Sequence, residues 1–151
     1  MDGKTAVYMY ICKNKTIKAM IKQDYLLRMI QEIITLIINM LLNKQKVRPQ
    51  QWVEYDTLTR QILGVSSEKL SELSPEEIME QYKDDANRMG KIELAAMTIL
   101  KIADETGDEH LVLKSRLRQN GLFLLEYIQN NGNTFSLQRV ALINMLKTDF
   151  S

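Results

Sequence analysis

Ten residues at positions 33–42, IITLIINMLL, constrain the fold of this chain more than any other feature. They belong to a longer segment, residues 21–44, in which apolar side chains recur at steps of three and four, as on one face of a helix. The residues at these steps are Leu26, Met29, Ile30, Ile33, Ile37, Met40 and Leu41. Ile34, Ile38 and Leu42 widen this face until only a narrow polar stripe remains. So broad an apolar face must be covered on two sides, by later helices of the chain or by a second copy.

A membrane span is the other structure that such a stretch could suggest. A spanning helix needs about 20 residues with few charges. Extending the ten apolar positions toward the N-terminus brings in Arg28 and Glu32, and extending them the other way brings in Lys44 and Lys46. The sequence therefore predicts a helix of a water-soluble core and no membrane span.

The first 19 residues do not fit this helical pattern. A short apolar run at positions 6–12 is followed by lysines and lacks the cleavage pattern of a secretory signal. We expect residues 1–19 to form a poorly defined tail, either loosely attached, lying on the domain, or upstream of a biological start at Met20. Residues 20–151 then form a single helical domain. The one cysteine, Cys12, cannot form an internal disulfide, which favours a reducing compartment and a cytoplasmic protein.

Further helix signals follow along the chain. Pro49 interrupts the first helix, a second helix is expected over residues 50–63, and Gly64 is a plausible left-handed stop. A short helical piece at 68–73 is followed by Ser74-Pro75-Glu76-Glu77. In that sequence the serine hydroxyl and the glutamate three residues later can each satisfy a free backbone N–H, and proline suits the first helical position. A helix therefore begins there.

Three more helices are expected at residues 85–106, 108–131 and 136–147. The short joint at Gly107 makes the first two antiparallel neighbours. Small residues (Ala95, Ala96, Ala103 and Gly121) allow helix backbones to approach closely. The predicted fold is all-α, with about six or seven helices arranged as antiparallel helical hairpins. The arrangement is tetratricopeptide-like or an irregular bundle, with the 21–44 helix at its centre.

Charge is distributed in bands. Residues 1–48 carry a net charge of +6, residues 49–109 a net charge of −8, and residues 110–151 a net charge of +3. Such banding favours either neutralisation within the chain or head-to-tail contact between copies. Acidic helices that simply present solvated faces explain the pattern as well, and we favour that simpler interpretation.

The residue types needed for common active sites are scarce. One histidine, His110, and one cysteine cannot supply a zinc site, a di-iron bundle or a Ser-His-Asp constellation. The glycines at 64, 90 and 107 lack the neighbours of a phosphate-binding loop. Paired carboxylates such as Asp84 and Asp85 are adjacent, so they point to different faces of a helix. The sequence thus predicts no enzyme, no metal and no cofactor.

The pattern of residues 58–73 suggests an alternative function. Gly64-Val65-Ser66 resembles the corner of a DNA-binding helix-turn-helix, with Leu70 pointing inward. The would-be recognition helix, however, offers one lysine against two glutamates inside the acidic band, and phosphate affinity depends on basic side chains. A DNA-binding regulator is the alternative hypothesis, and nucleic acid is not the partner we expect.

Three short motifs resemble a family of uncharacterised bacterial helical proteins, a domain of unknown function. The chain contains Asp24-Tyr25-Leu26-Leu27-Arg28-Met29-Ile30, then Leu63-Gly64-Val65-Ser66, then the Ser74-Pro75-Glu76-Glu77 cap. The resemblance covers about residues 20–147. It implies a tetratricopeptide-like C-terminal half over roughly residues 86–147, and it carries no active site to transfer.

The function we expect is a non-enzymatic interaction or scaffold module that binds a protein partner or forms a homodimer. Ile34, Ile38 and Leu42 are the predicted self-association face, because they lie beside the main apolar stripe and need a second cover. Burial of these three residues by the chain's own later helices explains the pattern equally well. The sequence does not indicate a small-molecule ligand.

Overall fold

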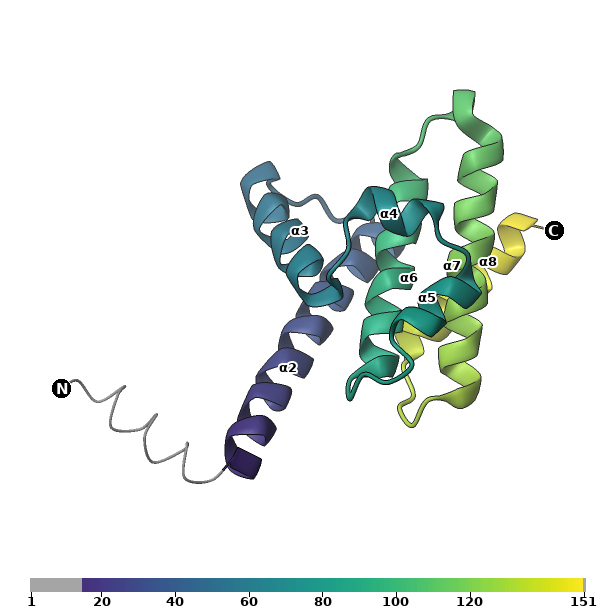
Figure 1. The fold of residues 1–151 in the computed structure, drawn as a ribbon. Coiled ribbons are helices and arrows are strands. Elements are labelled where there is room, and N and C mark those ends of the chain that lie inside the picture. The colour runs from purple at the N-terminus through teal and green to yellow at the C-terminus, as the bar shows by residue number, and fades with distance from the viewer. Residues whose placement is uncertain (1–14, 151) are drawn as a thin grey trace.

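The computed structural model describes residues 15–150, with side chains described for residues 23–149, and all regular structure in this part of the chain is helical (Figure 1). Seven α-helices and one 3-10 turn follow one another: α2 (Lys15–Leu42), α3 (Pro49–Leu63), α4 (Ser67–Glu72), α5 (Pro75–Gln81), α6 (Arg88–Glu105), η1 (Asp108–His110), α7 (Leu111–Asn131) and α8 (Leu137–Phe150). The predicted all-α fold is confirmed. Cys12 and the apolar run at 6–12 lie outside the described residues.

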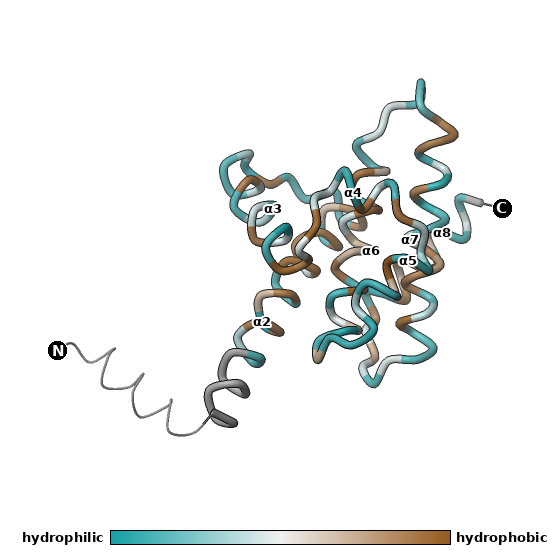
Figure 2. Tube along the Cα trace, viewed as in Figure 1, coloured by the Kyte–Doolittle hydropathy of each residue, from teal (hydrophilic) through white to brown (hydrophobic). Residues whose placement is uncertain are grey.

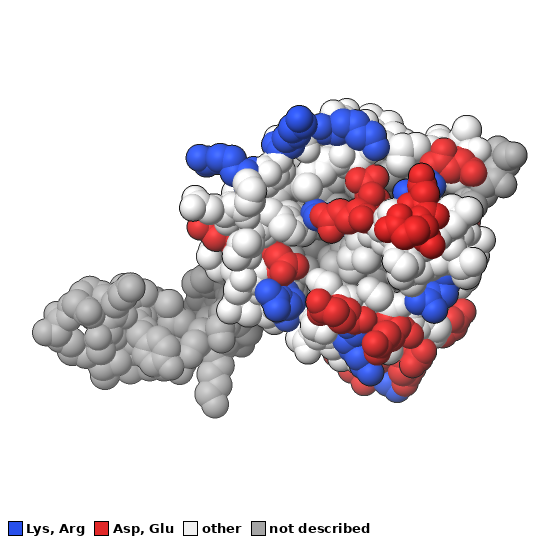
Figure 3. Space-filling model, turned by 90° about the horizontal axis from the view of Figure 1, so that it is seen from above, with Lys and Arg blue, Asp and Glu red and all other residues white. Residues whose placement is uncertain are grey.

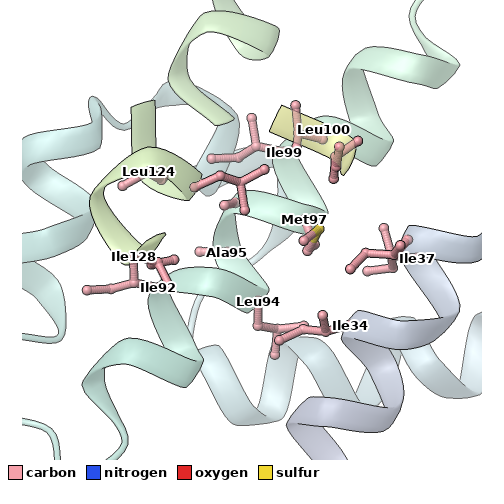
Figure 4. Close-up of a cluster of buried hydrophobic side chains, with 14 of the residues drawn as sticks. Ile34, Ile37, Ile92, Leu94, Ala95, Met97, Ile99, Leu100, Leu124 and Ile128 are labelled. Carbon is pink, nitrogen blue, oxygen red and sulfur yellow. The ribbon is translucent and has the colours of Figure 1, made fainter. Parts of the chain in front are cut away.

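The helix at the centre is α6, whereas the sequence predicted that the 21–44 helix would be central. Helices α2, α3, α4, α5 and α7 all contact α6. Residues 94–101 are buried without interruption, so this helix is enclosed on every side. Three of its residues are the small Ala95, Ala96 and Ala103, which leave room for neighbouring backbones. Figure 4 shows its side chains meeting those of α2 on one side and α7 on the other.

Helix α2 packs one face against α6 and keeps the other in contact with water. It is helical from Lys15, the first described residue, so it includes residues before the predicted start at 21, and nothing in residues 15–20 breaks a helix. Its buried residues follow the predicted spacing: Ile30, Ile33, Ile34, Ile37, Ile38 and Leu41. By length and composition alone, Gln23–Leu42 would also suit a membrane span, although a third of that window is buried inside the protein.

Helices α6 and α7 form an antiparallel hairpin held at short distance by Gly121. A Cβ built on Gly121 would lie 2.5 Å from Leu100 Cδ2 and 2.6 Å from Leu100 Cγ, well inside van der Waals contact. Only glycine therefore allows the backbone of α7 to pass so close to this part of α6. The sequence-based expectation that Gly121 marks a close helix approach is confirmed.

Local chemistry sets the helix ends in the first half of the domain. Gly64 adopts the left-handed conformation at the end of α3, with φ 73°. The Glu77 backbone N–H donates to Ser74 Oγ, and the Ser74 backbone N–H donates to the Glu77 carboxylate. Both hydrogen bonds are 3.1 Å long, so the predicted capping box is present. The buried Tyr82 hydroxyl donates to the Leu63 carbonyl at 2.7 Å, which ties the end of α3 to the segment after α5.

Candidate functional site

A buried arginine links three helices at the lower end of the domain. Arg139 on α8 is 2% exposed, and its guanidinium donates to Glu93 of α6 at 2.7 Å and to Gln129 of α7 at 2.9 Å. It also donates to the Thr134 carbonyl at 2.6 Å, in the loop before α8. Burial raises the pKa of Glu93, and the attraction of Arg139 opposes that rise.

A cleft of about 460 Å³ lies next to this arginine, between α2, the start of α6 and the loop before α8. Its carboxylates already have cations: Glu93 pairs with Arg139, and Asp85 pairs with Lys91 at 2.6 Å. Each side-chain nitrogen of Arg139 already has an acceptor within the protein. Arg139 therefore holds α6, α7 and α8 together, and the Asp85–Lys91 pair ties the turn before α6 to its first turn.

A second cluster joins α3 to α6. The ammonium of Lys101 lies 3.8 Å from the centroid of the Trp52 ring and forms an ion pair with Glu105. Burial lowers the pKa of Lys101, while the nearby carboxylates of Asp56 and Asp104 favour its charged form. The cluster lines a cavity of about 300 Å³. Because Lys101 is held by both an aromatic face and a carboxylate, its role here is to fasten α3 onto α6.

The first turn of α7 differs from these clusters because its apolar side chains are exposed to different degrees. Leu111 is 64% exposed, Val112 is 86% exposed and Leu113 is 38% exposed. We call these three residues the tip. Figure 1 shows this end of α7 standing above α4 and α6, and Figure 2 shows apolar residues within it. Isolated exposed apolar residues are ordinary, but three in succession at a projecting end form a patch that a protein surface usually covers.

The tip surrounds a hollow and has an acidic neighbourhood. The hollow, about 510 Å³, is lined by the tip together with Glu109, His110 and Arg116. Arg116 is anchored there because its guanidinium donates to the Ser71 carbonyl at 3.2 Å. The connection at residues 104–109 contains four carboxylates and no basic residue. Figure 3, which looks down on this end of the molecule, shows acidic side chains gathered in patches, with some basic ones along one edge and others beside the acidic patches.

The residues predicted as a self-association face lie elsewhere. Ile34 and Ile38 are buried in the core by the chain's own helices, and Leu42 is half-buried against it. This is the alternative that the sequence analysis left open. The surface that these two isoleucines offer to a second chain is therefore negligible in this fold, whereas three consecutive exposed apolar residues lie at the tip.

Sequence reasoning did not identify the tip. Leu113 lies four residues before the buried Leu117 and so continues the apolar step of α7. That spacing indicated a core position, but α7 extends past its neighbours and leaves Leu113 exposed. One signal was available: Leu111, Val112 and Leu113 are consecutive, so a helix cannot place all three on a single buried face.

The described residues contain no group of three or more histidine, cysteine or carboxylate side chains placed to hold a metal ion. The family resemblance and the tetratricopeptide-like arrangement expected from the sequence remain predictions. No protein-family model matches the chain, and no curated protein or solved structure is significantly similar to it.

Proposed function

We propose that this chain is a non-enzymatic, cytoplasmic protein-interaction module that contacts its partner through the tip of α7. The observation that carries the proposal is the exposure of three consecutive apolar residues at the projecting end of α7. Association that covers such side chains is favourable by about 25 cal/mol per Å² of apolar surface removed from water. The charged clusters at Arg139 and Lys101 support the same proposal, because both are engaged in holding helices together.

The alternative of a DNA-binding regulator draws less support from the described residues. Helix α4, the would-be recognition helix, has six residues and exposes Glu68, Lys69 and Glu72. Leu70 is buried, so this helix is fixed to the body of the protein. Two carboxylates against one ammonium give this surface little attraction for phosphate.

In-cell photocrosslinking tests the proposed contact. We expect a photoreactive phenylalanine analogue at position 112 to give covalent adducts with protein after irradiation. The matched control is the same analogue at position 119, an exposed glutamine on the body of α7. Adducts at 112 that exceed those at 119 several-fold support the proposal. Equal or absent adducts at the two positions contradict it.

A further inference from the structure

The cleft beside Arg139 contains polar groups that take no part in fastening the helices. Its volume of about 460 Å³ is that of a small-molecule site, for which about 300–1,000 Å³ is typical. Residues of α2, of the start of α6 and of the loop before α8 line it. Figure 1 shows the turn before α6 and the loop before α8 together at the lower end of the molecule. Separate parts of the chain therefore meet around one hollow.

Helix α6 begins at this cleft without a side-chain cap. Asn87 precedes the helix, in a position where an asparagine side chain ordinarily accepts a hydrogen bond from a backbone N–H two or three residues later. Here it accepts no such bond, and its Oδ1 instead accepts from Gln23 Nε2 of α2 at 3.4 Å. The backbone N–H groups of Met89 and Gly90 therefore have no acceptor within the described residues, and both residues line the cleft.

The side chain of Asn87 supplies a third open donor. Asn87 is 8% exposed, and its Nδ2 has no acceptor among the residues that the structure describes. In the same part of the chain no fully buried side-chain nitrogen or oxygen lacks a partner, so this nitrogen is in contact with solvent. Because Asn87 lines the cleft, that contact is within it. A nearly buried amide with an unused N–H indicates an acceptor that comes from outside the protein.

The charges of the cleft favour a ligand with one negative charge. Its two carboxylates are already paired with Arg139 and Lys91, and its Lys83 pairs with Glu80 at 2.6 Å. Arg88, an exposed residue that lines the cleft, forms no ion pair in the described part of the chain. The N-terminus of a helix also attracts negative charge. One unpaired cation and one helix end suit a monoanion.

We propose that this cleft binds a small organic carboxylate with an apolar tail. The carboxylate oxygens accept from the backbone N–H groups of Met89 and Gly90 and from Asn87 Nδ2. The tail lies against Leu27 and Ile30, apolar side chains of α2 that line the same cleft. This binding site is separate from the tip and does not depend on the proposed function.

An NMR titration of the full-length chain tests the proposal, with hexanoate as the probe. In proton–nitrogen correlation spectra, the backbone amides of Met89 and Gly90 and the side-chain amide of Asn87 should shift together and saturate. We expect a dissociation constant in the millimolar range, because the probe is small. Hexanamide, which has the same alkyl chain and no charge, should bind at least about tenfold more weakly, since hydrogen bonds to charged groups are the stronger ones.

Two variants with the same change in net charge separate recognition from folding. Aspartate caps a helix as well as asparagine does, so Asn87→Asp should keep the start of α6 intact. It replaces the Nδ2 donor with an anion, so hexanoate binding should weaken at least about tenfold. Asn43→Asp, at an exposed position after α2 and outside the cleft, should bind hexanoate like the wild type. Circular dichroism checks that both variants remain helical.

Three results would overturn the inference. The first is that the amides of Met89 and Gly90 do not shift in a large excess of hexanoate. The second is that hexanamide or inorganic phosphate binds as tightly as hexanoate, which contradicts recognition of a single carboxylate. The third is equal binding of hexanoate by Asn87→Asp and Asn43→Asp. The proposed function survives all three, because the tip lies at the opposite end of α7 (Figure 1).

Discussion

Replacing Arg139 with alanine will lower the free energy of unfolding by about 3–5 kcal/mol, the range expected when one partner of a buried ion pair is removed. The guanidinium is 2% exposed and pairs at 2.7 Å with the partly buried carboxylate of Glu93. Without it Gln129 and the Thr134 carbonyl also lose a donor. Urea denaturation followed by circular dichroism measures the change. A loss under about 1 kcal/mol would contradict this account of the cluster.

A double variant separates the ion pair from the space that it fills. Arg139→Met alone should be destabilised like the alanine variant, and adding Glu93→Met should recover most of the loss. A buried ion pair replaced by apolar side chains of similar volume is often neutral or stabilising. A double variant as unstable as the single one would show that the packing of the arginine, and not its charge, carries the effect.

The Arg139→Ala loss should shrink in acid. The pKa of Glu93 is raised above its ordinary value of 4.5 in the folded state because burial outweighs the attraction of Arg139. Removing Arg139 raises this pKa further. The folded variant then binds a proton more readily than the unfolded chain, so its stability increases as the pH falls from above the raised pKa to below 4.5. Urea denaturation of the wild type and the Arg139→Ala variant, at neutral and at mildly acidic pH, measures how much of the loss disappears in acid.

Gly121→Val is the second variant with a large expected effect, a destabilisation of about 1–3 kcal/mol from overpacking. The new Cβ would start 2.5 Å from Leu100 Cδ2, and Leu100 is itself 3% exposed, so the two helices must move apart. Thermal unfolding should show a lower Tm, by roughly 2–4 °C for each kcal/mol in a chain of this size.

Two companion variants test the cause of that loss. Gln119→Val places the same residue at an exposed position of the same helix and should change the stability by less than about 0.5 kcal/mol. In a Leu100→Ala background, Gly121→Val should be less harmful than in the wild type, because the missing leucine carbons leave space. If the losses of stability from Leu100→Ala and Gly121→Val simply add, contact between the new side chain and Leu100 is not the cause of the destabilisation.

The features that sequence alone could predict are those with a local cause. Ser74 and Glu77 form a capping box with backbone groups only three residues away, and Gly64 satisfies a backbone conformation that other residues adopt with difficulty. The face of α2 was predictable as well, since helical spacing decides which side chains share a side. Each of these depends on a few neighbouring residues.

The features that the sequence did not reveal depend on how far one helix extends past another. Leu113 and Leu117 have the same apolar character and lie one turn apart, yet Leu117 is 1% exposed and Leu113 is 38% exposed. For the same reason α6, and not the more apolar α2, is central: the number of helices around an element is a property of the whole arrangement. Likewise, the sequence could not decide whether Ile34 and Ile38 are covered by the chain's own helices or by a second copy. In the structure the chain's own helices cover them.

Hydrogen exchange of α2 tests most directly whether the apolar helix is a core element of a self-contained, water-soluble domain. In detergent-free buffer, the backbone amides of residues 31–41 should exchange as slowly as those of residues 94–101 in α6, because both open only when the domain unfolds. Rapid exchange in α2 beside a protected α6, or a chain that stays dispersed only in detergent, would contradict this and place the helix outside the core.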